Sequence, residues 1–262
     1  MTAWWFLTTC AEIHMPQKKD LLGDWWRKFP WWLVIVAIIG ATVVLSMLTS
    51  EGYIETLDYL LQGVSVTIMI SFAAYATALL IGLALALGRV SGNVFINNLA
   101  TLYIEVARGI PLLVVIIYVH FVVGPIFGLN RNPIVSGILA LSLGYGAYLA
   151  EVYRAGIESV ERGQVEAARS LGMSYRTAMR SVVLPQAVRT VLPALGNDLI
   201  AMLKDSSLVS AIAVGELTKR GQIEAARTFD TFRTYNVVAV LYLALTLLSS
   251  LIVRALERSR RP

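Results

Sequence analysis

Long runs without a charged residue constrain this chain more than any other feature of its sequence. Tyr59–Gly88 holds 30 consecutive uncharged residues, and Phe29–Ser50 holds 22. A helix needs about 20 apolar residues to cross a bilayer, where each backbone polar group must find its partner within the protein. Four further, mostly apolar stretches lie at about 97–123, 133–153, 187–214 and 234–253. The sequence therefore predicts an all-α membrane protein, a polytopic helical bundle with about six spans.

The composition supports this class and argues against several others. Hydrophobic residues make up 57% of the chain and charged residues 15%, whereas about a quarter of residues are charged in an average soluble protein. The single cysteine, Cys10, excludes a disulfide framework and a cysteine-rich metal site. The two histidines, His14 and His120, are far apart, and we expect His120 to pack or hydrogen-bond inside the membrane rather than bind a metal. We therefore expect neither a metal nor another cofactor in this chain.

The basic residues predict the orientation. With six spans and both termini in the cytoplasm, 15 Lys and Arg residues lie on the cytoplasmic side and 5 on the outer side. Positive charges accumulate on the cytoplasmic side of membrane proteins, so the opposite orientation is disfavoured. This bias also accounts for the net charge of +5 without any binding of nucleic acid. We expect residues 1–30 to form an interfacial tail, 31–50 an additional N-terminal span, and 257–262 a basic cytoplasmic tail.

A polar segment interrupts the apolar chain between the fourth and fifth spans. Residues 158–180 carry three acids and four arginines, too many charges for hydrocarbon. The spacing of its apolar residues predicts two short helices, with Gly172 capping the first in a left-handed conformation and Ser174 capping the second. Pro185 marks the next boundary. Since this segment is cytoplasmic in the predicted orientation, it is available to another protein.

The fifth span is unusually polar. Asp198 and Asp205 share one helical face with Ala201, and Lys204 lies on an adjacent stripe. Such a stripe faces a bundle interior or an aqueous cavity, so we predict a translocation path. An alternative is an internal salt bridge, for example between Lys204 and Glu151. The candidate path residues are Glu151, Asp198, Lys204, Asp205, Ser206 and Ser207.

Two features of the third span also lead to expectations. Glu105 and Arg108 are three residues apart, so they are expected to form an ion pair at the cytoplasmic edge of the membrane. Gly109 and Pro111 follow directly, and they predict a kink.

Several separated motifs resemble those of a known family. The polar segment contains Glu166-Ala167-Ala168, then Gly172 and Leu184-Pro185, and it resembles the EAA loop of ABC-transporter permeases. The run 163–208 and the upstream segments 103–115 and 144–160 are similar to the polar amino acid importer branch, which includes histidine, glutamine and arginine permeases. The resemblance covers roughly residues 59–256, with the EAA coupling loop at 158–185. A near copy of the motif, GQIEAAR at 221–227, lacks the distal glycine and Leu-Pro, and we interpret it as coincidence.

The resemblance implies a function and a set of partners. It implies the type I ABC importer transmembrane fold and a permease subunit, not an enzyme, that moves a polar amino acid through the bacterial cytoplasmic (inner) membrane by alternating access. The implied partners are cytoplasmic ABC ATPase subunits, a second permease subunit in a homodimer or heterodimer, and an extracytoplasmic solute-binding protein. ATP would bind the ATPase, since this chain has no phosphate-binding loop of its own. The implied ATPase-coupling residues are Glu166, Ala167, Ala168, Arg169, Leu171, Gly172, Leu184 and Pro185.

The alternative is an ion-coupled secondary amino acid transporter that uses Asp198, Asp205 or Glu151 for proton coupling. It needs no ATPase, so the polar loop would have no docking role. An intramembrane enzyme is a weaker hypothesis, because the sequence shows no paired histidines, cysteine site or nucleophile constellation.

Overall fold

The computed structural model describes residues 34, 38, 40–42, 44–45, 51–128 and 132–258. The chain divides into two compact units, Met1–Ser46 and Met47–Pro262. The described residues of the first unit are helical, and they fall within the predicted span at 31–50. The predicted tail at 1–30 and the last four residues lie outside the described residues.

The described part of the second unit consists of helices joined by short connections and contains no strand, which confirms the all-α fold class. Two π-helical segments, η1 and η3, and one 3₁₀ segment, η4, interrupt the α-helices. The elements are α3 Glu51–Arg89, α4 Val94–Gly109, α5 Leu112–Tyr118, η1 Val119–Val123, α6 Gly124–Phe127, α7 Pro133–Glu158, α8 Arg162–Ser170, α9 Tyr175–Ala178, η3 Met179–Val183, α10 Leu184–Asp205, η4 Ser206–Ile212, α11 Leu217–Thr228 and α12 Thr231–Arg258.

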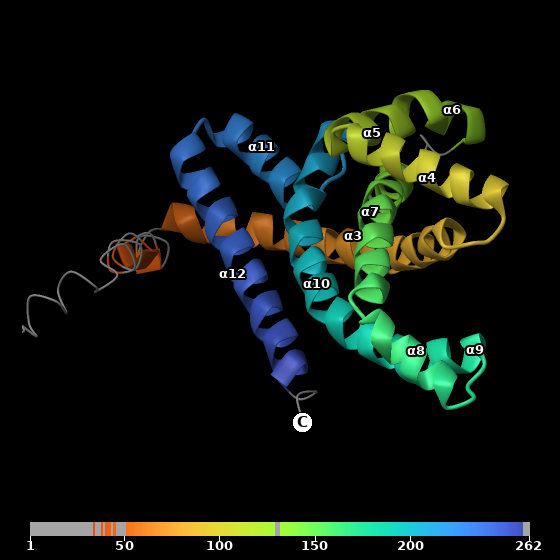
Figure 1. Cartoon of the computed structure of the whole chain (residues 1–262). Helices are drawn as coiled ribbons and strands as arrows, with labels where there is room; N and C mark the ends of the chain where they lie inside the picture. Colours follow the sequence, from red (N-terminus) through yellow and green to blue (C-terminus); the bar gives the residue numbers. More distant parts are fainter. Residues whose placement is uncertain are drawn as a thin grey trace, which may run out of the picture. The chain divides into compact units, whose positions relative to one another are not determined.

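Helices α3, α7 and α12 are each long and apolar enough to cross a membrane, and α4 with α5–α6 forms a fourth, bent candidate. These elements correspond to the second, fourth, sixth and third predicted spans. Among the described helices, α10 is the predicted span that does not qualify by composition, because its polar residues lower its hydropathy. It nevertheless packs against α3, α7 and α12 (Figure 1).

The core forms where α3 and α7 pack along each other. A Cβ atom at Gly82 of α3 would lie 2.8 Å from the Leu149 Cβ, and one at Gly146 of α7 would lie 2.6 Å from the Ile81 Cγ2. Small residues at such contacts let two backbones approach closely, which is the main source of helix association in lipid. The Ser142 hydroxyl also donates a hydrogen bond of 3.1 Å to the Ala74 carbonyl of α3.

The predicted kink in the third span is present. Helices α4 and α5 meet at an angle of 106°, and Ile110 between them is extended, with φ −103° and ψ 132°. Proline disfavours a helical conformation in the residue before it and lacks the N–H that a helix interior requires. Pro111 therefore ends α4 and starts α5.

Prolines also explain both π-helical segments. The residue before Pro125 and the residue before Pro185 each donate a hydrogen bond to a carbonyl five residues earlier, Val119 and Met179 respectively. A proline ring collides with the carbonyl four residues before it, and one wider turn removes this collision while the helix continues. Pro185 therefore changes the hydrogen-bonding pattern without ending the helix that leads into α10.

The segment after η4 folds into a short helix that packs on α3 and α12. The Glu216 carboxylate caps the start of this helix, α11, by accepting hydrogen bonds from the backbone N–H groups of Thr218 and Lys219 at 2.9 and 2.7 Å. The Tyr242 hydroxyl of α12 donates a third, at 2.8 Å. Burial raises the pKa of Glu216, although these hydrogen bonds oppose that shift. The segment between the predicted spans at 187–214 and 234–253 thus forms an ordered helix, α11, and the start of α12.

A cluster of ion pairs joins three helices near the end of α7. The Glu151 carboxylate, 18% exposed, contacts Arg89 at the end of α3 and Arg154 of α7, the latter at 2.7 Å. Arg108 of α4 lies 3.9 Å away. The expected pair between Glu105 and Arg108 is wrong, because Glu105 is instead 3.9 Å from Arg89. The bend after α4 directs Arg108 toward α7, where it also lies over the Tyr148 ring.

Replacement of Glu151 by Gln should destabilise the fold. The change leaves three arginines around an uncharged amide, and loss of a partly buried charged partner costs about 1–3 kcal/mol. We expect a lower Tm in detergent. The control is Glu158→Gln, whose carboxylate is 60% exposed and, among the described residues, forms its one ion pair with Arg154; it should cost less than about 1 kcal/mol. Equal losses in the two variants would contradict a central role for Glu151.

Candidate functional site

The polar segment lies beyond the end of α7, where α8 and α9 form a small helical hairpin. In Figure 1 this hairpin lies at the opposite end of α10 from α11. The chain leaves the hairpin through η3 and continues into α10 without a loop. The segment is therefore connected directly, on both sides, to helices of the bundle.

A Schellman motif ends α8. The N–H of Gly172 donates to the Arg169 carbonyl at 3.0 Å, and the N–H of Met173 donates to the Ala168 carbonyl at 3.2 Å, which is the hydrogen-bond pair that defines the motif. Gly172 has a φ of +83°, so the predicted left-handed cap is confirmed. Ser174 caps α9 as predicted, since its hydroxyl accepts a hydrogen bond of 3.2 Å from the Thr177 N–H.

The predicted coupling residues are mostly exposed. Glu166, Ala167 and Arg169 lie on the open side of α8, and Leu171, Leu184 and Pro185 are also exposed. Ala168 differs, because it is 4% exposed and packs inside the chain. Of the two alanines among the predicted coupling residues, Ala167 is therefore the one with an exposed side chain.

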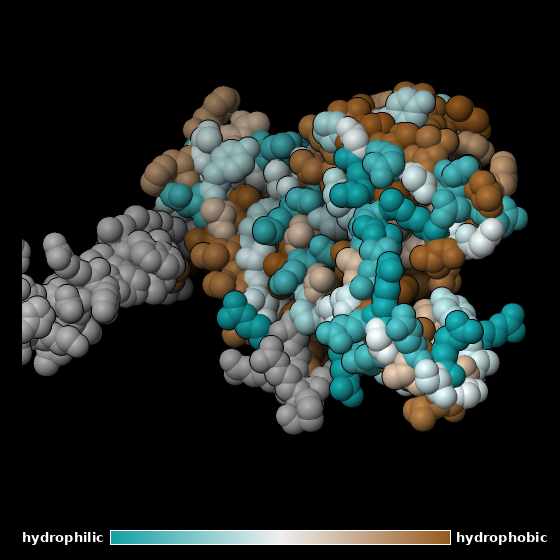
Figure 2. Space-filling view, in the orientation of Figure 1, coloured by the Kyte–Doolittle hydropathy of each residue, from teal (hydrophilic) through white to brown (hydrophobic). Residues whose placement is uncertain are grey.

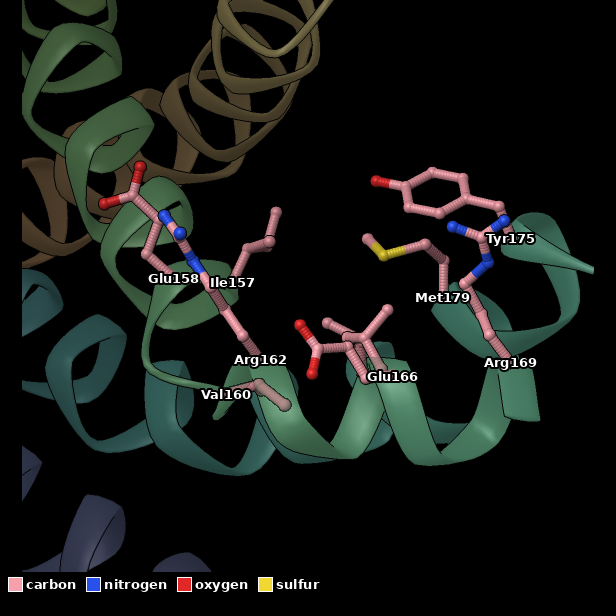
Figure 3. Close-up of a pocket in the computed structure, with 10 residues that line it drawn as sticks. Ile157, Glu158, Val160, Arg162, Glu166, Arg169, Tyr175 and Met179 are labelled. Atoms are coloured by element: carbon pink, nitrogen blue, oxygen red, sulfur yellow. The ribbon is translucent and has the colours of Figure 1, made fainter. Parts of the chain in front are cut away.

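A groove separates α8 from the end of α7 and from α9 and η3. It encloses about 610 Å³ and is open to solvent. Figure 3 shows Glu166 and Arg162 on α8 facing Ile157 and Glu158 of α7, with Met179 and Tyr175 across the hairpin. The groove thus combines an apolar floor with charged groups of both signs, and it lies beside the same helix that presents Glu166.

The near copy of the motif lies in a different environment. Glu224, in GQIEAAR, is buried in α11 and forms two hydrogen bonds of 3.0 Å with the Arg227 guanidinium. Glu166 is exposed, and among the described residues it lies within 4 Å of no cationic group. The same residues therefore have a structural role in α11 and a solvent-facing position in α8.

The polar stripe of α10 points partly into the bundle. Asp198 and Asp205 are half-buried, and Asp205 accepts a hydrogen bond of 2.6 Å from the Tyr145 hydroxyl of α7. The Oδ2 atom of Asp198 is buried without a hydrogen-bond partner. Ser206 is fully buried and donates to the Leu203 carbonyl at 2.8 Å, whereas Ser207 is half-buried and Lys204 exposed.

The structure separates Glu151 from the other candidate path residues. The ion pairs of Glu151 connect it to arginines of α3, α4 and α7. Among the described residues, Lys204 lies within 4 Å of no carboxylate. The salt bridge between Lys204 and Glu151, considered from the sequence, is therefore absent here.

Two tyrosines contribute to the α10 region in ways that the sequence analysis missed. Tyr145 contacts Asp205, and the Tyr75 hydroxyl of α3 donates a hydrogen bond of 2.6 Å to the Leu195 carbonyl of α10. Both lie in long apolar runs, where their positions predict only packing. Their hydroxyl groups could have indicated a polar contact from the sequence, because the hydroxyl of a buried tyrosine normally has a hydrogen-bond partner.

The described residues hold no group of three or more His, Cys, Asp or Glu that could bind a metal ion. His120 instead forms a hydrogen bond of 2.7 Å between its Nδ1 atom and the Ser136 Oγ, which confirms the expected packing and hydrogen-bonding role.

The chain is similar to known transport proteins. The family model for a binding-protein-dependent transport system inner membrane component matches residues 78–262. The chain is 37% identical over 205 residues to the probable amino-acid ABC transporter permease protein YckA of Bacillus subtilis, covering 78% of this chain and 90% of YckA. It is 38% identical over 200 residues to the glutamine transport system permease protein GlnP of Escherichia coli, covering 76% and 91%.

Solved structures agree with these relatives. A chain from the crystal structure of an amino acid ABC transporter with histidines superimposes with a TM-score of 0.75 at 39% identity, covering 79% of this chain and 97% of that one. A chain of the inward-facing MetNI methionine ABC transporter gives a TM-score of 0.69 at 21% identity, covering 82% and 100%. The second similarity supports the fold alone.

Replacement of Gly172 by Val should open the turn between α8 and α9. A residue with a Cβ atom destabilises a left-handed position by about 1 kcal/mol or more, which raises the open population about fivefold. We expect trypsin to cleave after Arg169 and Arg176 faster by a similar factor, because cleavage follows the open population. The control is Gly163→Val, since Gly163 has free space around it and an ordinary φ. Equal cleavage rates in both variants would contradict the capping role.

Proposed function

Because the chain belongs to the family of binding-protein-dependent transport system inner membrane components, we propose that it conducts a polar amino acid and is driven by a separate ATPase that docks on α8. The chain is a permease subunit of an ABC importer and not an enzyme. The named substrates of its relatives support an amino acid as cargo. The observation that carries the proposal is the continuity of the exposed helix α8 with the polar helix α10 through α9 and η3.

The proposed docking surface is the exposed face of α8. Glu166 and Arg169 supply charges of both signs, which favour one partner orientation over others. Ala167 adds no bulk, and the Schellman turn at Gly172 holds the helix at a fixed angle to α9. Leu171 adds an exposed apolar contact, while Leu184 and Pro185 follow at the start of α10. Ala168 acts from the inside, by packing α8 against its own chain.

We propose that the protein lies in the cytoplasmic membrane with α8 and both termini in the cytoplasm. The orientation is supported by the distribution of basic residues, with 15 on the cytoplasmic side and 5 on the outer side. An ABC ATPase binds on the cytoplasmic side, a solute-binding protein on the outer side, and a second permease subunit, identical or different, completes the path. ATP binds the ATPase, and this chain needs no cofactor.

The proposed path runs along the polar face of α10. An amino acid carries an ammonium and a carboxylate group, so a path needs both an anionic and a cationic partner. Asp198 and Asp205 are the anionic candidates, and Lys204 is the cationic one. The Tyr145 hydroxyl holds Asp205 in place, and Ser206 and Ser207 follow in η4. Glu151 acts as a structural anchor at the α3–α7 junction in this proposal, because its ion pairs occupy it.

The mechanism follows from the connections of α8. When the ATPase subunits close, they displace α8, and the displacement reaches α7 at one end and α10 at the other. Since packed helices move as units, the path then changes its access from one side of the membrane to the other. An ion-coupled transporter would leave the exposed charges of α8 without a function, and no contact among the described residues favours it.

Replacement of Glu166 by Lys should abolish transport while the protein still folds. Glu166 is exposed, so the fold does not depend on it, but the change reverses a charge on the docking surface. We expect normal protein levels in the membrane, loss of substrate uptake, and loss of the ATPase in a pull-down. The contrasting variant is Glu224→Lys in the near copy of the motif. Because Glu224 is buried beside Arg227, that variant should lose folded protein.

The two variants distinguish docking from folding. Uptake at the normal rate by Glu166→Lys, at normal protein level, would rule out α8 as the coupling surface. Retention of uptake after ATP depletion, with loss of uptake in the presence of a protonophore, would instead support the ion-coupled alternative.

Cysteine labelling tests the path. Ala201 lies on the same face of α10 as Asp198 and Asp205, and Cys10 is the single cysteine of the chain. In a Cys10→Ser background, we expect a water-soluble maleimide to label Ala201→Cys in at least one transport state. The control is Leu247→Cys on the exposed apolar side of α12, which lipid should protect. Protection of Ala201→Cys in every state would contradict the path.

A further inference from the structure

The turn between α11 and α12 presents an exposed, strained phenylalanine. Phe229 caps the end of α11 with φ 54° and ψ 15°, and its residue surface is 91% exposed. Glycine usually occupies such a left-handed position, and a bulky residue there is uncommon. Phe229 therefore accepts backbone strain without gaining contacts within the described chain. A binding partner outside the described chain would account for a bulky residue at this position.

A second phenylalanine lies three residues later. Phe232, in the first turn of α12, is 77% exposed. Figure 2 shows hydrophobic surface at the turn between α11 and α12. Two large aromatic side chains in one short turn form an apolar patch at this end of the bundle.

The position of Phe232 on α12 indicates what covers the patch. Phe232 precedes Leu243 by 11 residues, which is close to three full turns at 3.6 residues per turn, so both lie on the same side of the helix. Leu243, Leu247 and Leu251 are exposed on α12, a helix long and apolar enough to span the membrane. The patch therefore continues the exposed apolar side of α12, which we take to face lipid.

The charges on α12 set the depth of the patch. Arg233 and Arg254 enclose 20 uncharged residues, a length of about 30 Å that matches the hydrocarbon core. Phe232 is adjacent to Arg233, and Phe229 lies one turn beyond. Both phenylalanines are thus at the height of the headgroup boundary. A partner that docked from the aqueous side alone would not account for a patch on the lipid-facing side of the helix.

We propose that Phe229 and Phe232 insert into the membrane interface and anchor the turn between α11 and α12 in the phospholipid layer. Phenylalanine is among the apolar residues that interfacial segments bury at the boundary between headgroups and acyl chains. The orientation proposed above places them in the outer leaflet, but their depth does not depend on that orientation. The anchor holds α11, whose capping residue Glu216 joins it to α12 through Tyr242, at a constant height beside the bundle.

The test uses single cysteines labelled with an environment-sensitive fluorophore in the Cys10→Ser protein, reconstituted in nanodiscs of phosphatidylethanolamine and phosphatidylglycerol. We expect labels at Phe229→Cys and Phe232→Cys to be quenched by lipids that carry a nitroxide near the headgroup, and iodide quenching about threefold weaker than at an aqueous site. Gln222→Cys on the exposed side of α11 is the aqueous control, and Leu247→Cys is the control for deep quenching.

Other results would overturn the anchor. Iodide quenching equal to that at Gln222→Cys would place the patch in water. Weak quenching by both reagents, or shielding that appears only with the solute-binding protein or a second permease chain, would identify a protein contact instead.

A further variant, Phe229→Gly, relieves the left-handed strain and so keeps the turn folded. It should make a label at Phe232→Cys more accessible to iodide. An unchanged accessibility would show that Phe229 contributes no anchoring. Neither result depends on coupling at α8, so the anchor can fail while the proposed function holds.

Discussion

The exclusion of charge from hydrocarbon determines where this chain can place its polar contacts. A charged side chain at the centre of a bilayer is costly, so charges collect at helix ends or pair with each other. In this protein the largest cluster of ion pairs among the described residues forms around Glu151, where Arg89, Arg108 and Arg154 meet. The cluster joins α3, α4 and α7 at the point from which the chain leaves for α8. Helix α8, with the polar segment proposed for coupling, therefore follows a firmly held part of the bundle.

Close packing between α3 and α7 provides the rigid part of the bundle. Gly82 and Gly146 have no side chains that would keep the two helices apart. Because lipid provides no hydrophobic driving force for helix association, close dispersion contacts hold the two helices together. In contrast, α10 carries polar groups that need hydrogen-bond partners. The Tyr75 and Tyr145 hydroxyls supply two of these contacts from α3 and α7. Rigid packing on one side and adaptable polar contacts on the other suit a bundle in which one helix moves relative to its neighbours.

The sequence was sufficient for the fold class and for the ends of the coupling segment. Uncharged runs identified α3, α7 and α12, and local backbone rules identified the caps at Gly172 and Ser174, because these depend on residues within one turn of each other. Contacts between distant helices were beyond such rules. Glu105 and Arg108 have ideal spacing for a pair within one helix, yet the bend at Pro111 and the packing of α4 on α7 give them other partners. The partners of Glu151 were also not predictable, since the sequence does not show which helices a buried acid contacts; the structure gives it Arg89, Arg108 and Arg154.

The two copies of the EAA motif show how position decides the use of the same residues. In α11 the glutamate is buried and paired with Arg227. The glycine of this copy, Gly221, makes room for Val238 of α12, because a Cβ atom at Gly221 would lie 2.7 Å from the Val238 Cγ2. In α8 the corresponding glycine, Gly163, has free space around it, and the glutamate is exposed.

The difference arises from the turn that comes after each copy of the motif. The first copy is followed by a Schellman turn and a second short helix, which hold α8 away from the bundle. The second copy is followed by the strained residue Phe229, and the chain folds back at once into α12, so that α11 packs against α12 and α3. A helix of this composition thus stays exposed only where the next turn keeps it apart from its own chain, and the proposed docking on α8 depends on that exposure.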